Sequence, residues 1–414
     1  MKTSTVAQYL ADPLTGLPAT GDFQVSPYRG TIALAAVGQP SIGVGTSATG
    51  TYVGGGTSFY FTDILGNHNL AFAVNANGSV KDFGGEVMYQ NVGRRFVWGV
   101  DAGHTSYASA FATVEPLPSD PALGVISQFI QRMYVDQASL SSQYPFSVAR
   151  RAELNFSVTH LGFNTEVHQL LTDGNTILDE ARFDTTSADP INFAQAAAAF
   201  VGDNSFFGFT SPINGWRYRF EFSPTFGGLQ FQTALADMRK YFFARPVTFA
   251  IRGLHFGRYG ADAETNKLTP LFVGDPSIVR GYAAETFDPV ECTVNAASPR
   301  SCPEFDRLVG SRLAAASIEL RIPLFGTEQL GLIRSPLFPV DIAPFLDGAV
   351  AWSRDESPSF TLARQSAERI PVFSAGVSAR ANLFGYAVLE VFYAHPFQRP
   401  DKNWVLGFQL APGW

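Results

Sequence analysis

WRYRFEF, residues 216–222, is the stretch of this sequence that decides the class of fold. Its four aromatic residues alternate with Arg217, Arg219 and Glu221. Successive side chains of a β-strand point to opposite faces, so the stretch predicts a strand with one aromatic and one charged face. In a soluble sandwich the aromatic face would lie in the core. In a membrane barrel it would meet lipid, and the charged face would line a wet lumen.

The composition favours the membrane alternative. Only 16% of the 414 residues are charged and 14% are aromatic, whereas soluble domains carry about 25% charged residues. No uninterrupted apolar run approaches the ~20 residues that a membrane helix needs. Open sheet edges cannot be satisfied in lipid, so a chain that crosses with strands must form a closed barrel. The net charge of −7 and the absence of Lys/Arg runs disfavour nucleic-acid binding.

Similar alternation recurs along the chain in segments of strand length, separated by turn residues. We predict about sixteen strands, at residues 30–38, 50–62, 69–77, 84–91, 96–107, 126–138, 150–161, 191–202, 215–225, 228–238, 246–257, 311–322, 340–353, 371–382, 386–394 and 403–411. Bacterial barrels have an even number of strands. The expected fold is therefore all-β, a transmembrane antiparallel barrel over residues 28–414. Residues 1–27 are expected to be a linker or the remnant of a periplasmic N-terminal region.

The connectors fall into two classes when they are numbered alternately. One class is mostly short and the other contains long segments at residues 108–125, 162–190, 259–310 and 354–370. Membrane barrels have short periplasmic turns and long external loops. This places both termini in the periplasm and makes residues 259–310 the sixth external loop. The Pro-rich connection 323–339 is a long exception on the periplasmic side.

The sixth loop contains IVRGY, residues 278–282, in which apolar and aromatic residues surround a single cation, Arg280. Such a cluster favours burial, and a buried guanidinium needs acidic partners. The alternative is an ordinary loop arginine in solvent. Glu319 shares its strand face with Arg321, so strand parity also directs Glu319 toward the charged side.

Cys292 and Cys302 are the only cysteines, and both fall in this loop. We predict that they form a disulfide, which implies an oxidising location outside the cytoplasm. A metal site would need more ligands nearby, and no histidine lies between the two cysteines.

The sixth-loop sequence Val279-Arg280-Gly281-Tyr282 resembles the VRGF/VRGY signature of the BamA-like outer-membrane superfamily. This superfamily includes bacterial surface antigens, outer-membrane protein assembly factors and two-partner secretion transporters. The resemblance covers roughly residues 28–414. It implies a sixteen-stranded barrel whose sixth loop folds into the lumen.

Within that resemblance, the loop arginine contacts acidic residues on the next strands, which correspond to Glu319 and Asp347 here. The superfamily's strand motif F-x-D-x-G matches Phe345 and Asp347. This sequence departs from the motif, with Ala349 in place of the glycine and Gly348 one position earlier. Residues 57–67, TSFYFTDILGN, look like members that follow a periplasmic β-propeller.

The resemblance also implies a weakly paired seam between the first and last strands, which would involve Leu34, Leu406, Gly407 and Phe408. A glycine within a strand weakens it or permits a kink. A seam that opens sideways would offer a substrate strand an edge to pair with. The alternative is an ordinary closing strand.

The expected function is insertion or translocation of polypeptides at a bacterial outer membrane, with no cofactor and no metal. The expected partners are outer-membrane lipids, a polypeptide substrate, and membrane or periplasmic proteins. One alternative is a passive pore or a structural anchor for a periplasmic domain or partner. Another is a soluble β-protein of the secretory pathway. An enzyme is disfavoured, because the chain has no G-x-S-x-G elbow and its six histidines form no metal-binding pattern.

Overall fold

A computed structural model describes most of the chain after residue 26. The described residues are 27–47, 50–77, 79–292, 302–335, 338–361, 363, 369–399 and 401–410. The expected linker therefore lies outside the described residues, except for its last position. Within the described ranges, no helix has the length and apolar character to cross a membrane.

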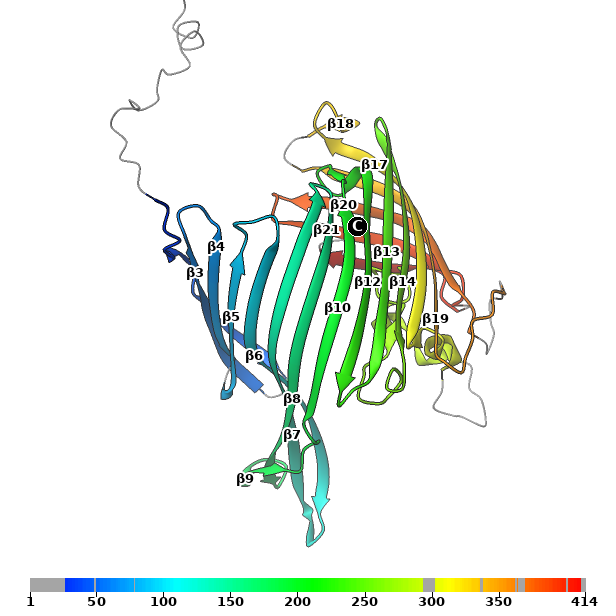
Figure 1. Cartoon of the computed structure of the whole chain (residues 1–414). Coiled ribbons are helices and arrows are strands. Elements are labelled where there is room, and N and C mark those ends of the chain that lie inside the picture. Colours follow the sequence, from blue (N-terminus) through cyan, green and yellow to red (C-terminus); the bar gives the residue numbers. More distant parts are fainter. Residues whose placement is uncertain are drawn as a thin grey trace, which may run out of the picture.

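The chain is built almost entirely of antiparallel strands (Figure 1). The long strands are β3 (Gly50–Thr62), β4 (His68–Asn77), β5 (Ser79–Asn91), β6 (Val97–Leu117), β7 (Asp120–Ser147), β8 (Arg150–Thr172), β10 (Ile191–Asp203), β12 (Pro212–Gly227), β13 (Phe231–Ala244), β14 (Val247–Tyr259), β17 (Arg312–Gly326), β19 (Val340–Trp352), β20 (Val372–Leu383) and β21 (Ala387–Pro396). Shorter elements are β1 (Ala33–Val37), β2 (Ser41–Ser47), β9 (Ile177–Thr185), β11 (Phe206–Phe207), β15 (Leu271–Phe272), η2 (Ala284–Thr286), η3 (Pro289–Glu291), α2 (Pro303–Asp306), β16 (Val309–Gly310), β18 (Ile333–Arg334) and β22 (Val405–Leu410).

Consecutive long strands pair with each other and form one continuous wall. Strands β1 and β2 both pair with β3, so they form one interrupted strand. From β3 the pairing runs through β4, β5, β6, β7, β8, β10, β12, β13, β14, β17, β19, β20, β21 and β22. Within the described ranges this gives sixteen strand positions if β1 and β2 count as one. The predicted all-β barrel-type fold and its strand number are confirmed.

The two ends of the wall are not joined in the part of the chain that the structure describes. Leu34 in β1 lies opposite Phe61 in β3, and Leu406 in β22 lies opposite Tyr393 in β21. No pairing joins β22 to β1 or β2 among these residues. The side chains of Leu34 and Leu406 are exposed. The expected seam residues therefore occupy two free edges.

The sequence predicts long loops at residues 108–125 and 162–190, and this prediction is wrong. Strand β6 continues to Leu117 and β7 begins at Asp120, so only a tight turn separates them. Strand β8 likewise continues to Thr172 and pairs with β9. The extended hairpins project beyond the other strands (Figure 1). Their pairing is supported by the stacked rings of Phe111 and Phe129, 5.0 Å apart.

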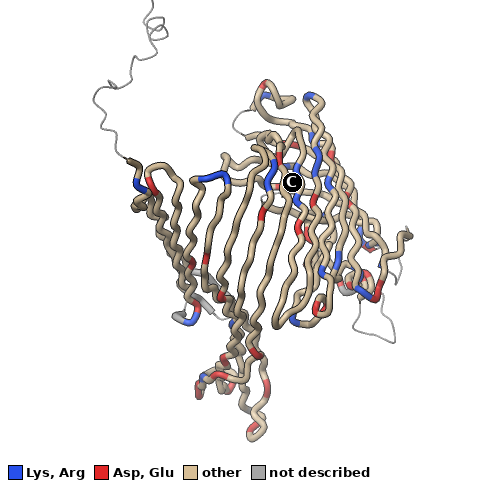
Figure 2. Tube along the Cα trace, viewed as in Figure 1, with Lys and Arg blue, Asp and Glu red and all other residues tan. Residues whose placement is uncertain are grey.

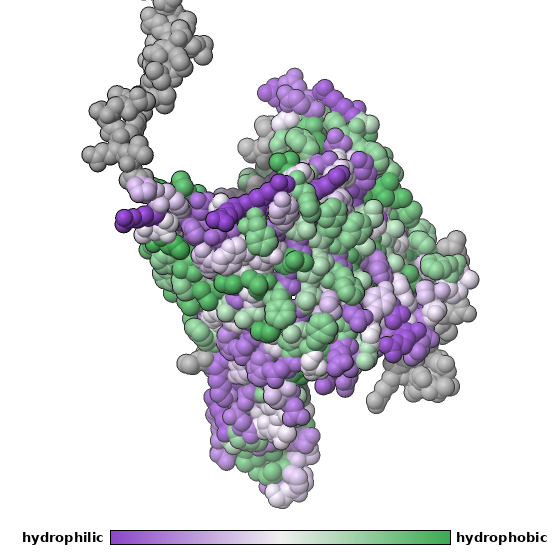
Figure 3. All heavy atoms as spheres, in the orientation of Figure 1, coloured by the Kyte–Doolittle hydropathy of each residue, from purple (hydrophilic) through white to green (hydrophobic). Residues whose placement is uncertain are grey.

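The two faces of the wall differ in polarity, as the alternation of aromatic and charged residues predicts. Phe220 and Phe222 of β12 are exposed on the outer face, whereas Arg219 and Glu221, which alternate with them, pair on the inner face. Hydrophobic side chains dominate the middle of the view in Figure 3, and hydrophilic ones gather along its upper edge and on the projecting hairpins. Much of the strand trace in the same orientation carries no charge (Figure 2).

Candidate functional site: a buried charge cluster on the inner face

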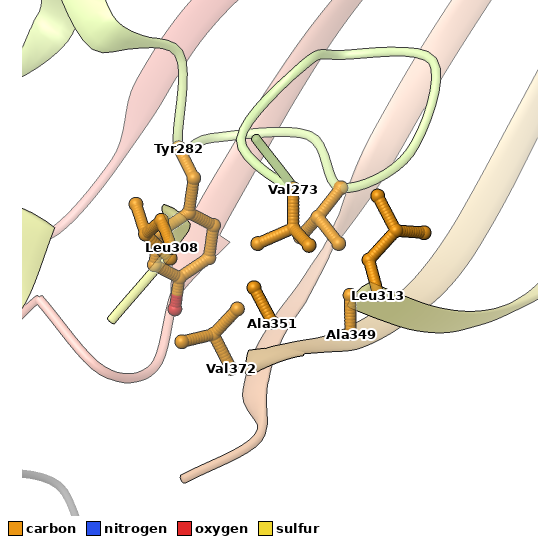
Figure 4. Packing of buried hydrophobic residues seen from close by; sticks show 8 residues of the cluster. Val273, Tyr282, Leu308, Leu313, Ala349, Ala351 and Val372 are labelled. Atoms are coloured by element: carbon orange, nitrogen blue, oxygen red, sulfur yellow. The ribbon is translucent and has the colours of Figure 1, made fainter. Parts of the chain in front are cut away.

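The connection between β14 and β17 folds back against the inner face of the wall. Its short strands β15 and β16 pair with each other. Its apolar residues Val273, Tyr282 and Leu308 pack against Leu313, Ala349, Ala351 and Val372 of the wall (Figure 4). Val279 is fully buried in the same cluster. This packing positions Arg280 toward β17, β19 and β21.

Gly281 allows the chain to approach the wall closely. Its φ of 90° lies in a region that residues with a Cβ rarely adopt. A Cβ at this position would also lie 3.2 Å from the Cβ of Ala394 in β21. Both the backbone conformation and the available space therefore favour glycine between Arg280 and Tyr282.

The structure brings Arg280 together with Asp347 and Glu319. Nε and Nη2 of Arg280 donate to the two carboxylate oxygens of Asp347, each at 2.8 Å. Its Nη1 donates to Oε1 of Glu319 at 2.8 Å. The guanidinium also lies over the ring of Phe345, with Cζ 3.5 Å from the ring centroid. Arg280 is only 2% exposed, so the alternative of a solvent-exposed loop arginine does not describe this structure.

Three further residues complete the cluster, and sequence reasoning did not assign them to it. Glu390 of β21 accepts from Nη1 of Arg280 at 2.9 Å. Arg380 of β20 donates to Oε2 of Glu319 at 2.8 Å and to Oε1 at 2.6 Å. Arg321 of β17 donates to Oε2 of Glu319 at 2.8 Å. Three guanidinium groups and three carboxylates thus share one buried site, which we call the clamp (Arg280, Glu319, Arg321, Asp347, Arg380 and Glu390).

The register of the wall explains why these side chains meet. Asp347 lies opposite Ser317 across β17 and β19, one inward position from Glu319. Glu390 lies opposite Arg380 across β20 and β21. Arg380 and Glu390 are each the one charged residue on the inward face of their strand. That isolation was the available sequence signal for Arg380 and Glu390.

The clamp also reaches the last strand. Gln409 of β22 donates from Nε2 to Oε2 of Glu390 at 2.6 Å. The neighbouring Gly407 lies against Phe392 of β21, and a Cβ there would lie 2.3 Å from the phenylalanine ring. Phe408 points to the exposed face. A short path therefore leads from the free edge of β22 through Glu390 to Arg280.

The strand motif residues occupy two faces of β19. Phe345, Asp347 and Ala349 are buried on the inner face. Ala349 packs in the apolar cluster around Val279 and Tyr282, so the methyl group that replaces the expected glycine has a packed environment. Gly348 faces the other way, where a Cβ would meet the ring of Phe373 at 2.8 Å.

Tyr282 and Arg399 fasten the loop at its outer end. The Tyr282 hydroxyl donates to the carbonyl of Phe373 at 2.9 Å and accepts from the backbone N–H of Gln398 at 3.0 Å. Burial raises the pKa of this hydroxyl well above its usual value. Arg399 donates to the carbonyl of Gly281 at 2.8 Å and to both carboxylate oxygens of Glu291. The segment after β21 thus holds the loop from outside the clamp.

Cys292 and Cys302 lie at disulfide-bonding distance, with their Cα atoms 4.6 Å apart. Among the residues that the structure describes, no three His, Cys, Asp or Glu side chains are grouped to hold a metal ion. The site offers paired charges and packed apolar residues, which suit the fastening of a loop rather than catalysis.

Comparisons with known proteins give a family and a fold. A family model described as the Omp85 superfamily domain matches residues 43–413. No curated protein matches the chain. Among solved structures, BamA from Haemophilus ducreyi lacking POTRA domains 1–3 is 14% identical with a TM-score of 0.53, over 92% of this chain and 70% of that chain.

Two further solved structures are less similar in shape. CdiB from Acinetobacter baumannii is 13% identical with a TM-score of 0.45, over 89% of this chain and 58% of that chain. CdiB from Escherichia coli is 11% identical with a TM-score of 0.45, over 93% of this chain and 63% of that chain. The chain thus spans less than two thirds of either CdiB chain. The likeness to the BamA structure concerns the fold alone.

Proposed function

The chain belongs to the Omp85 superfamily, and from this premise we propose that it inserts or translocates polypeptides at a bacterial outer membrane. The clamp is the observation that carries the proposal. It buries the tip of the sixth loop inside the wall and connects it, through Glu390 and Gln409, to the edge strand β22. As a member of this superfamily the chain is not an enzyme.

In this proposal the sixth loop plugs the lumen and the free edges of β1 and β22 form the seam. An edge strand presents unpaired N–H and C=O groups, and an incoming strand can pair with them by β-augmentation. Substrate pairing and burial of its apolar face supply the free energy, so the cycle needs no nucleotide or other cofactor. Polypeptide substrates, partner proteins and outer-membrane lipids are the proposed partners.

The proposed orientation follows from loop length. The sixth loop faces the cell exterior and the shorter turns face the periplasm, which places both termini in the periplasm. Residues 1–27 then form the proposed linker on that side. The proposed disulfide between Cys292 and Cys302 lies in the external loop, which is consistent with an oxidising location.

Locking the seam tests the proposal. The double variant Leu34→Cys, Leu406→Cys is oxidised in cells, and the two single variants under the same oxidant are the controls. We expect loss of polypeptide insertion or secretion in the double variant and recovery on reduction. Wild type under the same reductant accounts for any effect on the native cysteines. Full activity with a completely crosslinked seam would favour the alternative, a passive pore or structural anchor.

A further inference from the structure

The connector between β10 and β12 forms a separate small hairpin at the end of the wall opposite the sixth loop. Phe206 lies opposite Asn214, and Phe207 lies opposite Pro212. Pairing of β12 with β13 starts only at Gly215. The φ of Gly215 is 103°, and a Cβ there would lie 2.5 Å from the carbonyl oxygen of Asn204. Residues 204–214, which we call the inner strap, therefore turn away from the register of the wall.

The inner strap is bound by strands that are not its neighbours in the sheet. Thr210 and Ser211 donate through their hydroxyls to the Asp341 carboxylate of β19, the latter at 3.4 Å. Asn382 of β20 donates to the carbonyl of Phe209 at 2.5 Å. Thr210, Ser211 and Asp341 are all buried.

Two more contacts come from β14 and β17. The Thr248 hydroxyl donates to the carbonyl of Ile213 at 3.2 Å, and Nη1 of Arg321 donates to the carbonyl of Pro212 at 2.9 Å. Strand β12 is separated from β20 by β13, β14, β17 and β19. A turn that only joined β10 to β12 would not reach these inward side chains. The inner strap therefore crosses the interior.

Arg321 connects the inner strap to the clamp. Its Nη1 binds the strap, while its Nε binds Oε2 of Glu319 at 2.8 Å. Oε1 of Glu319 in turn accepts from Arg280 at 2.8 Å. Glu319 is fully buried and Arg321 is 1% exposed. Hydrogen bonds in such a water-poor network reinforce one another, so loss of one contact weakens the next.

We propose that the inner strap is a second plug, and that Arg321 couples its seating to the seating of the sixth loop. The two plugs close opposite ends of the interior and share Glu319 through one arginine each. If the proposed function is correct, a polypeptide that enters from the strap end displaces the strap first. The Arg321–Glu319 contact then loosens Arg280 at the other end.

The first experiment measures closure. Deletion of residues 205–213 leaves Asn204-Asn214-Gly215, residue types that favour a tight turn. Ion conductance of the purified barrel is recorded in planar lipid bilayers. The matched control is the double variant Ile64→Ser, Leu65→Ser, which alters two exposed residues in the turn between β3 and β4.

We expect the strap deletion to conduct severalfold more than wild type and the control to match wild type. Heat-modifiable mobility on gels establishes that each variant is folded. If the deletion variant does not fold, Asn382→Ala, which removes one donor to the strap, takes its place with a smaller expected increase. A folded strap variant with wild-type conductance would overturn the second plug.

The second experiment measures coupling. The variant Thr210→Val, Ser211→Ala removes both strap donors to Asp341 without altering the clamp. We expect faster hydrogen–deuterium exchange at residues 278–282 than in wild type, and no change in the control turn variant. Unchanged exchange at 278–282 in a folded strap variant would overturn the coupling. Neither experiment uses a polypeptide substrate, so each can succeed or fail independently of the transport assay.

Discussion

At the scale of single residues, Arg280 is the only group of the loop tip that binds carboxylates from three separate strands. Its planar fork holds Asp347 with two parallel hydrogen bonds while Nη1 remains for Glu319 and Glu390. A lysine ammonium presents a point charge and cannot reproduce that geometry. Burying these charges is tolerable only because the site contains three cations and three carboxylates that compensate one another.

Replacing Arg280 tests how strongly this fastening holds. We expect Arg280→Ala to destabilise the seated loop by about 3–5 kcal/mol, because it leaves buried carboxylates without their partner. Arg280→Lys should also destabilise it, since the paired contact with Asp347 is lost. The readouts are hydrogen exchange at residues 278–282 and the temperature of the gel-mobility transition. Arg182→Ala, an exposed arginine of β9, is the control, and equal effects at both positions would contradict the clamp.

Gly281→Ala separates backbone strain from crowding. A residue with a Cβ in this conformation costs about 1–3 kcal/mol, and the contact with Ala394 adds to that cost. Gly385 in the turn between β20 and β21 has a similar φ of 84°, but a Cβ there has no neighbour within 4 Å. We expect Gly281→Ala to lower the gel-mobility transition temperature more than Gly385→Ala does. Equal shifts would show that the close approach to β21 is unimportant.

Strand parity and the resemblance to the superfamily located Arg280, Glu319 and Asp347 from sequence, because these residues lie in or close to recognisable motifs. Glu390 and Arg380 were missed for a physical reason. Their contact with the clamp depends on the register of β20 and β21, and Glu390 is 110 positions from Arg280 in the chain. No local sequence pattern indicates that two residues so far apart in the chain are in contact.

At the scale of elements, the sixth loop is held by the segment that follows β21 as well as by the wall. Arg399 is fully buried, binds Glu291 through two nitrogens, and lies over the ring of Phe287 with Cζ 3.9 Å from the centroid. Burial alone would raise the pKa of Glu291, but the hydrogen bonds and charge of Arg399 outweigh it and lower that pKa. The sixth loop and the segment that follows β21 thus fasten each other.

The ion pair between Glu291 and Arg399 makes the stability of the seated loop depend on pH. A carboxylate whose pKa is lowered on folding contributes stability above its unfolded pKa of about 4.3 and loses it as the pH falls through the folded value. We expect the difference in transition temperature between wild type and Glu291→Gln to shrink as the pH is lowered below that point. Glu285→Gln, at an exposed glutamate of the same loop, is the control. A difference that stays constant with pH would contradict the pairing.

Element boundaries were the weakest part of the sequence reasoning. The segment around Pro116 and Pro121 contains turn residues, which favour a loop, yet pairing continues to Leu117 on one side and resumes at Asp120 on the other. The sequence does not indicate the inner strap either, because residues 204–214 are mostly polar, aromatic, Gly or Pro residues typical of a turn. Their contacts with Asp341 and Arg321 exist only once the wall is curved.

At the scale of the whole molecule, the outer face of the wall is the more apolar one. Phe220 of β12 lies on that face, 39% exposed, beside the outward rings of Tyr218 and Phe200. Leu235 of β13 lies opposite Glu221 and therefore on the inner face. Membership of the superfamily and this distribution of side chains both favour lipid outside and water inside.

A charge placed on each face decides between a membrane barrel and a soluble β-protein. In a bilayer, a lysine at the midplane of the outer face costs about 2–4 kcal/mol, whereas inner-face substitutions are tolerated. We therefore expect Phe220→Lys to lower the stability of the protein folded in lipid vesicles, measured by urea unfolding. The matched variant Leu235→Lys should stay close to wild type, because its ammonium reaches the wet side near Glu221. The reverse order of stabilities would place water on the aromatic face and reject the membrane barrel.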